Sequence, residues 1–275
     1  MTLLTVAEPL LVASTLGLCI GFLMAITGAG GAILALPLLT LLLHLTMQQA
    51  APIALMAVFA VSSIAAVIGL KQGRVRYKAA ALLAATGVAA APLGVSLAIK
   101  TPAVILHGLF IVVLCYVAWR VLRNNLLSDE MCTLTQTPCQ INPATSKLFW
   151  TAGCTRRMLI TGGTAGFLSG LLGVGGGFIV VPSLQKISNL EHRMIVATTL
   201  TMIALVSLVS VLTYASHAEI IWQIALPFML ASIAGSLAGR SISNKIPQRT
   251  KHIIFGSMAL MIALMMLARL IIEFN

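Results

Sequence analysis

The chain has 275 residues, of which 59% are hydrophobic and 8% are charged, with a mean hydropathy of +1.05 and a net charge of +11. Soluble domains carry roughly 25% charged residues, so the composition excludes a soluble protein and indicates an all-α polytopic membrane protein. The positive charge does not indicate nucleic acid binding, because the basic residues lie at the ends of apolar segments, as in cytoplasmic loops.

The first apolar segment, residues 9–43, is too long for one straight crossing. It spans about 52 Å as a helix at 1.5 Å per residue, whereas the hydrocarbon core is about 30 Å thick. Glycines interrupt it at Gly28, Gly30 and Gly31. The segment therefore either turns back at these glycines or crosses with a large break. No Lys or Arg precedes Lys71, so a signal peptide is not expected and the segment should belong to the mature protein.

Three ordinary spans follow, at about 50–70, 79–99 and 103–119, and complete a first unit over residues 1–123. The stretch 124–155 contains Asp129, Glu130 and two prolines with little periodicity, and we expect it to be a linker.

The five cysteines do not indicate a disulfide framework, because their number is odd and two lie in apolar spans. Cys132, Cys139 and Cys154 lie in or near the linker. Their C-x6-C spacing fits no common zinc pattern. We interpret them as incidental loop cysteines and expect no metal site.

The second unit, residues 156–275, repeats the first. It has a broken segment at 157–185 and spans at 194–214, 220–238 and 253–272. A shift of 145 residues lays GFLMAITGAGGAILALPLL (21–39) on GFLSGLLGVGGGFIVVPSL (166–184) without a gap, and it also pairs Ser62 with Ser207. One register held over a hundred positions indicates an internal duplication.

Basic residues help to choose between two topologies, because they favour the cytoplasm. If each broken segment crosses once, the halves are parallel and 10 of the 17 basic residues lie inside. If each segment returns to its own side, the halves are inverted and 15 of 17 lie inside. The count favours two inverted repeats, an architecture of secondary transporters that hold the substrate where the repeats meet.

The glycine clusters suggest an anion site. A helix break inside a bilayer frees backbone N–H groups, and the helix that resumes presents the positive end of its dipole. We expect one cavity where the two breaks meet, lined by Gly28, Ala29, Gly30, Gly31, Gly173, Val174, Gly175, Gly176 and Gly177, with hydroxyls from Thr27, Ser62 and Ser207. Other glycines with four-residue spacing, such as Gly17 and Gly21, are better explained by helix packing.

The acidic residues support an anionic substrate by their positions. All six, namely Glu8, Asp129, Glu130, Glu191, Glu219 and Glu273, lie at span ends or in loops, whereas cation pumps place carboxylates inside spans. A dinucleotide-binding loop is excluded, because Phe178 stands where the G-x-G-x-x-G pattern needs its third glycine. No cofactor is expected.

The paired segments GFLMAITGAGGAILALP and GFLSGLLGVGGGFIVVP resemble the TauE/SafE family of sulfite exporters, over about residues 10–123 and 157–270. The resemblance implies a multi-pass permease of the bacterial inner membrane for small sulfur-containing or organic anions such as sulfite, thiosulfate or sulfonates. It implies that the signature positions are the clustered glycines together with Pro37 and Pro182. The sequence leaves a homodimer open.

Two other functions are considered. An intramembrane serine protease would need G-x-S-G, but Phe167 replaces the first glycine before Ser169 and Gly170, so we do not expect an enzyme. A non-transporting membrane partner of a sulfur-metabolism enzyme stays open, and the linker cysteines are the feature that keeps it so.

Overall fold

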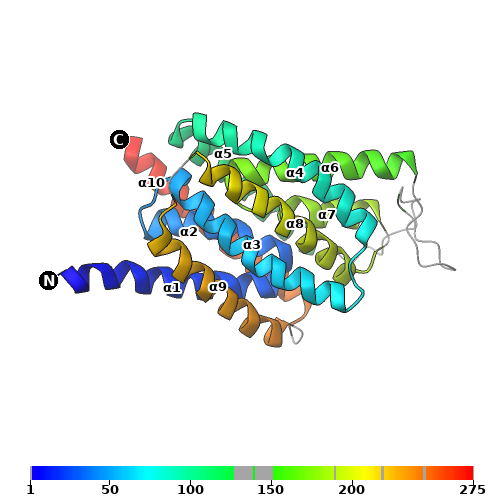
Figure 1. Ribbon diagram of the computed structural model, residues 1–275, viewed down its shortest axis with the longest axis horizontal. Coiled ribbons are helices and arrows are strands. Elements are labelled where there is room, and N and C mark those ends of the chain that lie inside the picture. Colours follow the sequence, from blue (N-terminus) through cyan, green and yellow to red (C-terminus); the bar gives the residue numbers. More distant parts are fainter. Residues whose placement is uncertain are drawn as a thin grey trace.

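The computed structural model describes residues 2–126, 139, 151–188, 190–217, 220–243 and 246–274. These residues form an elongated bundle of helices (Figure 1). Within this part of the chain, six helices are long and apolar enough to cross a membrane. Large apolar side chains such as Leu93, Val112 and Leu230 are exposed on the outside of the bundle, as contact with lipid requires. The expected all-α polytopic architecture is confirmed.

The first half begins with a helix that ends at the glycine cluster. The segment expected at 9–43 consists of α1 (Thr2–Thr27), the 3₁₀ helix η1 (Gly28–Leu34) and α2 (Ala35–Leu42). The three spans that follow are α3 (Met47–Lys71), α4 (Tyr77–Lys100) and α5 (Ala103–Leu126). Thus α5 continues into the first residues of the expected linker.

The second half has the same order of elements. The broken segment consists of α6 (Ala152–Leu172) and α7 (Gly177–Ile187), and α8 (His192–Ala215), α9 (Trp222–Ser243) and α10 (Gln248–Phe274) lie at the three expected spans. The six helices long enough to cross a membrane are α1, α3, α4, α5, α8 and α9, whereas α10 contains a shorter apolar helix, Ile253–Arg269. Helix α6 begins inside the stretch expected as linker. The rest of that stretch, residues 127–138 and 140–150, lies outside the described residues.

Hydroxyl side chains support the starts of several helices. Thr46 and Gln49 form a capping box at the start of α3, and Thr151 Oγ1 accepts a hydrogen bond from the Cys154 N–H at the start of α6 (3.2 Å). Before α4, the N–H of Arg76 donates to Thr198 Oγ1 of α8 (3.1 Å). Such caps satisfy N–H groups that a helix cannot pair internally.

The chain turns back at both glycine clusters. Near the end of α10, Arg269 donates to the Thr40 carbonyl of α2 (3.1 Å) and to His44 Nδ1 (3.0 Å). This places the end of α2 at the end of the bundle where α1 begins (Figure 1). In the second half, Cys139 forms a disulfide with Cys154 near the start of α6, and its N–H donates to the Ile187 carbonyl at the end of α7. The start of α6 and the end of α7 therefore lie at the same end of the bundle. Each broken segment is therefore a hairpin.

The two hairpins enter the bundle from opposite ends, since α1 begins at one end and α6 at the other (Figure 1). A hairpin followed by three spans crosses an odd number of times. This course supports the inverted arrangement of the halves, which itself stays a prediction.

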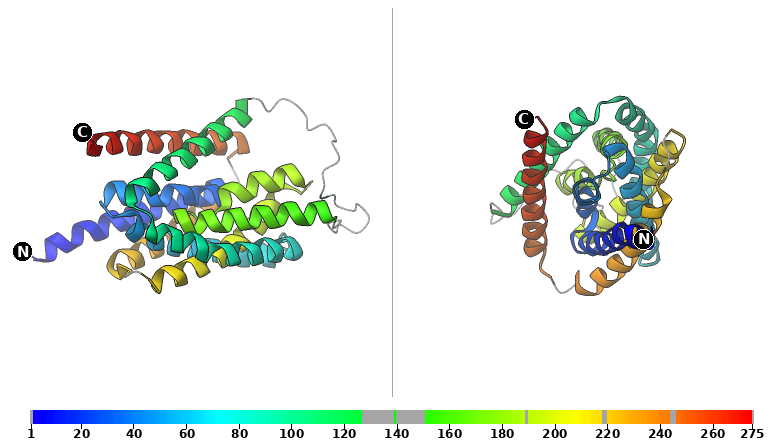
Figure 2. Two further views of the ribbon diagram at one scale, coloured as in Figure 1. Left: turned by 90° about the horizontal axis from the view of Figure 1, so that it is seen from above. Right: turned by 90° about the vertical axis from the view of Figure 1, so that its left-hand side faces the viewer.

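Helix pairing follows the duplication. Helix α1 packs against α9 and α6 packs against α4, while α3 pairs with α8 and α5 with α10 (Figure 2). The counterparts in the two halves are α1 and α6, α3 and α8, α4 and α9, and α5 and α10. The α1–α9 pair is therefore equivalent to the α6–α4 pair, and each of the other two pairs joins an element to its own counterpart. The most enclosed spans are α3 and α8.

Glycines allow the closest of these approaches. A Cβ at Gly21 of α1 would overlap the Ser232 carbonyl oxygen of α9, and a Cβ at Gly166 of α6 would overlap the Gly87 carbonyl oxygen of α4. The two contacts are related by the 145-residue shift in both partners. The packing role expected for the glycines with four-residue spacing is thus present at α1–α9 and α4–α6.

Substitution of Gly166 tests this packing against a matched site. Gly166→Val forces α6 away from α4, so we expect a loss on the order of 1–3 kcal/mol and a lower Tm of the purified protein in detergent. Gly163→Val is the control, because a Cβ at Gly163, on the same helix, meets nothing within 4 Å. Equal losses for the two variants would contradict the packing role.

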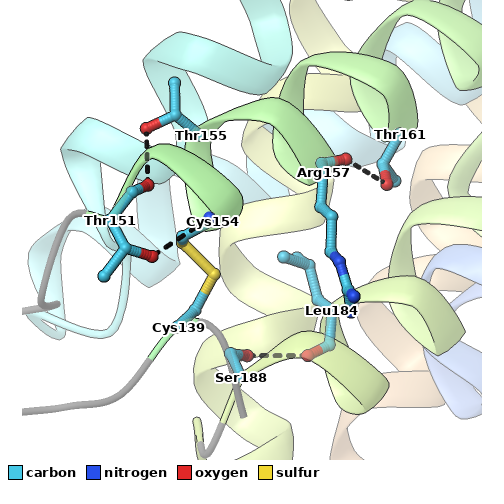
Figure 3. The surroundings of a disulfide bond; sticks show 8 residues. All are labelled: Cys139, Thr151, Cys154, Thr155, Arg157, Thr161, Leu184 and Ser188. Atoms are coloured by element: carbon cyan, nitrogen blue, oxygen red, sulfur yellow. Dashed lines mark hydrogen bonds between the residues drawn. A yellow bond between two sulfur atoms is a disulfide. The ribbon is translucent and has the colours of Figure 1, made fainter.

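A disulfide joins Cys139 to Cys154, with their Cα atoms 5.2 Å apart (Figure 3). Both residues are fully buried. The interpretation of these two as incidental loop cysteines is therefore wrong. The number and spacing of the cysteines do not indicate this bond, because it depends on the position of Cys139 in space, where its N–H donates to the Ile187 carbonyl at the end of α7. Cys19 and Cys115 are free.

Peptide mapping tests the pairing. Lys147 is the sole Lys or Arg between the two cysteines in the sequence. After free thiols are alkylated, tryptic digestion without reduction should give the peptide ending at Lys147 linked to the peptide 148–156. The link should survive Cys132→Ser and be lost in Cys139→Ser. A link that is lost in Cys132→Ser and kept in Cys139→Ser would contradict the Cys139–Cys154 pairing.

Candidate anion site

The first break is a tight turn. Gly28 adopts φ +74° and ends α1, and η1 then continues directly into α2. A residue with a side chain is strained at this φ, so glycine suits the position. The preceding hydroxyl, Thr27 Oγ1, donates to the Leu23 carbonyl one turn back (2.7 Å). The chain therefore changes direction within very few residues and leaves no unwound loop.

The second break is unwound over residues 173–176, between α6 and α7, and is completely enclosed. Gly173, Gly175 and Gly176 all have positive φ, between +69° and +73°, and residues 171–178 are buried throughout. The Gly173 N–H donates to the Ser169 carbonyl (2.9 Å) and ends α6, while Gly176 precedes α7. This break is an unwound turn, unlike the 3₁₀ turn of the first half.

A cavity of about 490 Å³ reaches the first break. Thr27, Gly28 and Ala32 line it at the hairpin, and Ser62 of α3 lines it from the side. Its apolar walls include Val58 of α3 and, from α8, Leu200 and Ile203. The cavity therefore lies between the first hairpin and the central pair of helices α3 and α8.

The mouth of the cavity is basic. It lies where α3–α4, α7–α8 and α9–α10 connect, and it is lined by Arg74, Arg193, Arg240 and Lys251. Among the described residues that line the cavity, none is Asp or Glu. Such a cluster of one sign in a concave site raises the local concentration of anions.

Lys251 is held in place and perturbed by its surroundings. Its Nζ donates to Ser243 Oγ (2.9 Å). Burial, and then repulsion from Arg193, lower the pKa of the Lys251 ammonium below its ordinary value. Lys251 precedes the apolar segment Ile253–Arg269. An anion at the mouth would relieve the repulsion between these cations.

The cavity contains only part of the set expected from the sequence. It brings together Thr27, Gly28 and Ser62. Gly30 faces the Phe255 ring, and Gly31 is buried against Met24 and Thr27. The side chain of Ala29 lies outside what the structure describes.

The residues expected from the second break do not line this cavity: Gly173, Val174, Gly175, Gly176, Gly177 and Ser207. The described cavity thus reaches the first break and not the second, and Val58 and Ile203 lie between it and Gly175. A Cβ at Gly175 would lie 2.8 Å from Val58 Cγ1 and 3.2 Å from Ile203 Cγ2, and both residues also line the cavity.

The hydroxyls of the two halves differ in their bonding. Ser62 Oγ donates to the Val58 carbonyl one turn back, as serine commonly does in helices. Its repeat counterpart, Ser207, is fully buried, and its Oγ has no hydrogen-bond partner within the described part of the chain. Ser207 Oγ lies 3.6 Å from the position of a Cβ at Gly175, so this hydroxyl faces the second break.

The sequence did not reveal the basic residues as part of the site. Arg74, Arg193, Arg240 and Lys251 come from three separate connections, and in the sequence they indicate a topology and basic span ends rather than one shared site. Their shared position at one end of the bundle was the available signal. The cavity lies within one chain, and a homodimer stays a prediction.

Known membrane proteins resemble this chain over nearly its whole length. Residues 13–266 match the family model described as sulfite exporter TauE/SafE. The chain is 26% identical to a probable membrane transporter protein of Xylella fastidiosa strain Temecula1, over 95% of this chain and 96% of the relative. It is 25% identical to the probable membrane transporter protein YdhB of Bacillus subtilis, over 87% and 91%. No solved structure matches the chain.

These matches favour a membrane transporter over a non-transporting partner or an enzyme. The match covers both glycine clusters and all the helices that surround the cavity. The chain belongs to the sulfite exporter TauE/SafE family of membrane transporters.

Proposed function

We propose that the protein carries a small oxyanion, with sulfite as the first candidate and thiosulfate or a sulfonate as the next, through the cavity that ends at Thr27 and Gly28. One observation carries this proposal: a polytopic bundle contains a cavity with four cationic side chains at its mouth and, among its described lining residues, no carboxylate. A cation would be repelled there, whereas an oxyanion is attracted.

The polar groups at depth suit an oxyanion of this size. Thr27 and Ser62 line the cavity, and a hydroxyl that bonds a carbonyl one turn back can rotate to donate to a ligand instead. The backbone at Gly28 has no side chain to keep a ligand away. An anion entering from the mouth thus exchanges water for charge-assisted hydrogen bonds, which are stronger than neutral ones.

The bilayer orientation follows from the charges. We propose that the basic mouth faces the cytoplasm of a bacterial cell and that the two inverted halves open the cavity to the two sides in turn. The membrane potential alone can then drive anion efflux, because moving one charge across 100 mV is worth about 2.3 kcal/mol.

Flux measurements test the substrate and the role of the mouth together. In proteoliposomes, we expect sulfite flux by the wild type and a several-fold higher KM in Arg240→Gln and Lys251→Gln, because each variant removes one charge from the mouth. Added salt should weaken wild-type transport more than that of the variants.

Lys71→Gln is the matched control. Lys71 is an exposed cation at the same end of the bundle and does not line the cavity, so its loss should leave KM unchanged. Equal effects of all three substitutions on KM would contradict the proposed role of the basic mouth in attracting the anion. Absence of flux for sulfite, thiosulfate and sulfonates would contradict the proposed substrates.

The lowered pKa of Lys251 predicts a pH dependence. A lowered pKa means that the ammonium loses its charge at a lower pH than an ordinary lysine does. The KM for the anion should therefore rise as the pH increases through that pKa. Lys251→Arg should abolish the rise, because a guanidinium stays charged. A rise that persists in Lys251→Arg would assign it to another group.

A further inference from the structure

We propose that the second half contains a closed counterpart of the cavity, a vestibule that opens at the opposite end of the bundle and is plugged by Tyr214. This inference rests on the proposed function, because it supplies the second opening that the transported anion needs. It is carried by the repeat register, by the packing of Tyr214 and by two buried hydroxyls for which the described residues provide no hydrogen-bond partner.

The repeat register identifies the counterpart. Five residues that line the open cavity are Met24, Ser62, Ala65, Ile68 and Gly69. The 145-residue shift pairs them with Ser169, Ser207, Ser210, Thr213 and Tyr214, in that order. The counterparts are closed, since all but Thr213 are 0% exposed, and every one of them carries a hydroxyl.

Tyr214 fills the space that its counterpart leaves open. Gly69 has no side chain and borders the cavity, whereas the fully buried Tyr214 extends from α8 to α6 and donates from its hydroxyl to the Gly170 carbonyl (3.1 Å). Gly170 is in turn the counterpart of Ala25, another lining residue. The tyrosine side chain therefore runs from α8 to α6, the counterparts of α3 and α1, whose residues Gly69 and Ala25 border the open cavity.

Tyr214 lies at the end of the bundle opposite the basic mouth, as a second opening requires. Helix α8 begins at the basic mouth with His192 and ends at Ala215. At 1.5 Å per residue, Tyr214 is about 33 Å from that mouth along the helix. A vestibule unplugged at Tyr214 would open to the side of the membrane opposite the mouth.

Two unsatisfied hydroxyls indicate a ligand position inside the closed space. Ser169 Oγ and Ser207 Oγ are buried and have no hydrogen-bond partner among the described residues. Buried polar groups are normally paired, so such exceptions need an explanation. Both can donate to an oxyanion once the vestibule opens, and Ser207 faces the second break at Gly175.

Val58 and Ile203 divide the two spaces. They are counterparts under the 145-residue shift, and both contact the open cavity on one side and Gly175 on the other. An anion can pass from Ser62 to Ser207 only when this apolar pair separates. Tyr214 and the Val58–Ile203 pair are thus positioned as two closures in series.

Cysteine accessibility tests the vestibule without any substrate. In a variant lacking the three cysteines outside the disulfide, Cys19, Cys115 and Cys132, a single cysteine is introduced as Ala65→Cys or Ser210→Cys. Each variant is then treated from either side of the membrane with a charged, membrane-impermeant thiol reagent. Ala65→Cys should react only from the side of the basic mouth. Ser210→Cys should be protected from both sides.

Opening the plug should change this pattern. Tyr214→Phe keeps the ring and removes the hydrogen bond, so we expect labelling of Ser210→Cys from the side opposite the mouth to rise about fivefold, and to rise further in Tyr214→Ala. Tyr116→Phe, on an exposed tyrosine of α5, is the control and should have no effect.

The outcomes separate this inference from the proposed function. Labelling that stays absent in well-folded Tyr214→Phe and Tyr214→Ala, or that occurs only from the mouth, would overturn the vestibule. If the expected labelling is observed but no sulfur anion is transported, the vestibule stands and the substrate assignment fails. Monodispersity in detergent establishes that each variant is folded, and Tyr214→Phe alone decides the result if Tyr214→Ala is not.

Discussion

Backbone hydrogen bonding in hydrocarbon is the constraint on which this fold depends. A helix that ends inside a bilayer leaves N–H and C=O groups that lipid cannot satisfy, so such an end must be surrounded by protein or by a polar cavity. Each hairpin turn satisfies this requirement in a different way. The turn at Gly28 borders a cavity, and the turn at Gly173–Gly177 is buried among helices. The central helices α3 and α8 supply most of the enclosure.

Close helix packing makes this enclosure continuous. Without a hydrophobic driving force between helices in lipid, association depends on van der Waals contact and on backbones that approach closely. The glycines of α1 and α6 place these helices directly against carbonyl oxygens of α9 and α4. Each hairpin is thereby attached to a span of the other half, so a relative movement of the halves would displace a hairpin together with the span that holds it.

The sequence predicted the helices and the interruptions well, because apolar length and glycine clusters are local properties. It also indicated the packing of Gly21 and Gly166 from their spacing. The sequence placed Thr27, Gly28 and Ser62 at a cavity, but it could not show that the cavity reaches only the first break. That depends on how side chains pack: Gly69 borders the cavity, whereas Tyr214, at the equivalent position of the second half, is fully buried. The convergence of Arg240 and Lys251 with Arg74 likewise required the helix ends to be placed together. The hydrogen bond that brings Cys139 to α7 left no local pattern.

The disulfide has a consequence for where and when it can form. It lies at the end of the bundle that carries most of the basic residues, and both sulfur atoms belong to fully buried residues. In the orientation proposed from charge, that end meets a compartment whose thiol pool keeps most cysteines reduced. Exchange requires a thiolate to reach one of the sulfurs, and burial denies this access. The bond would therefore persist through kinetic protection, and it would have to form before the hairpin of α6 and α7 packs around it.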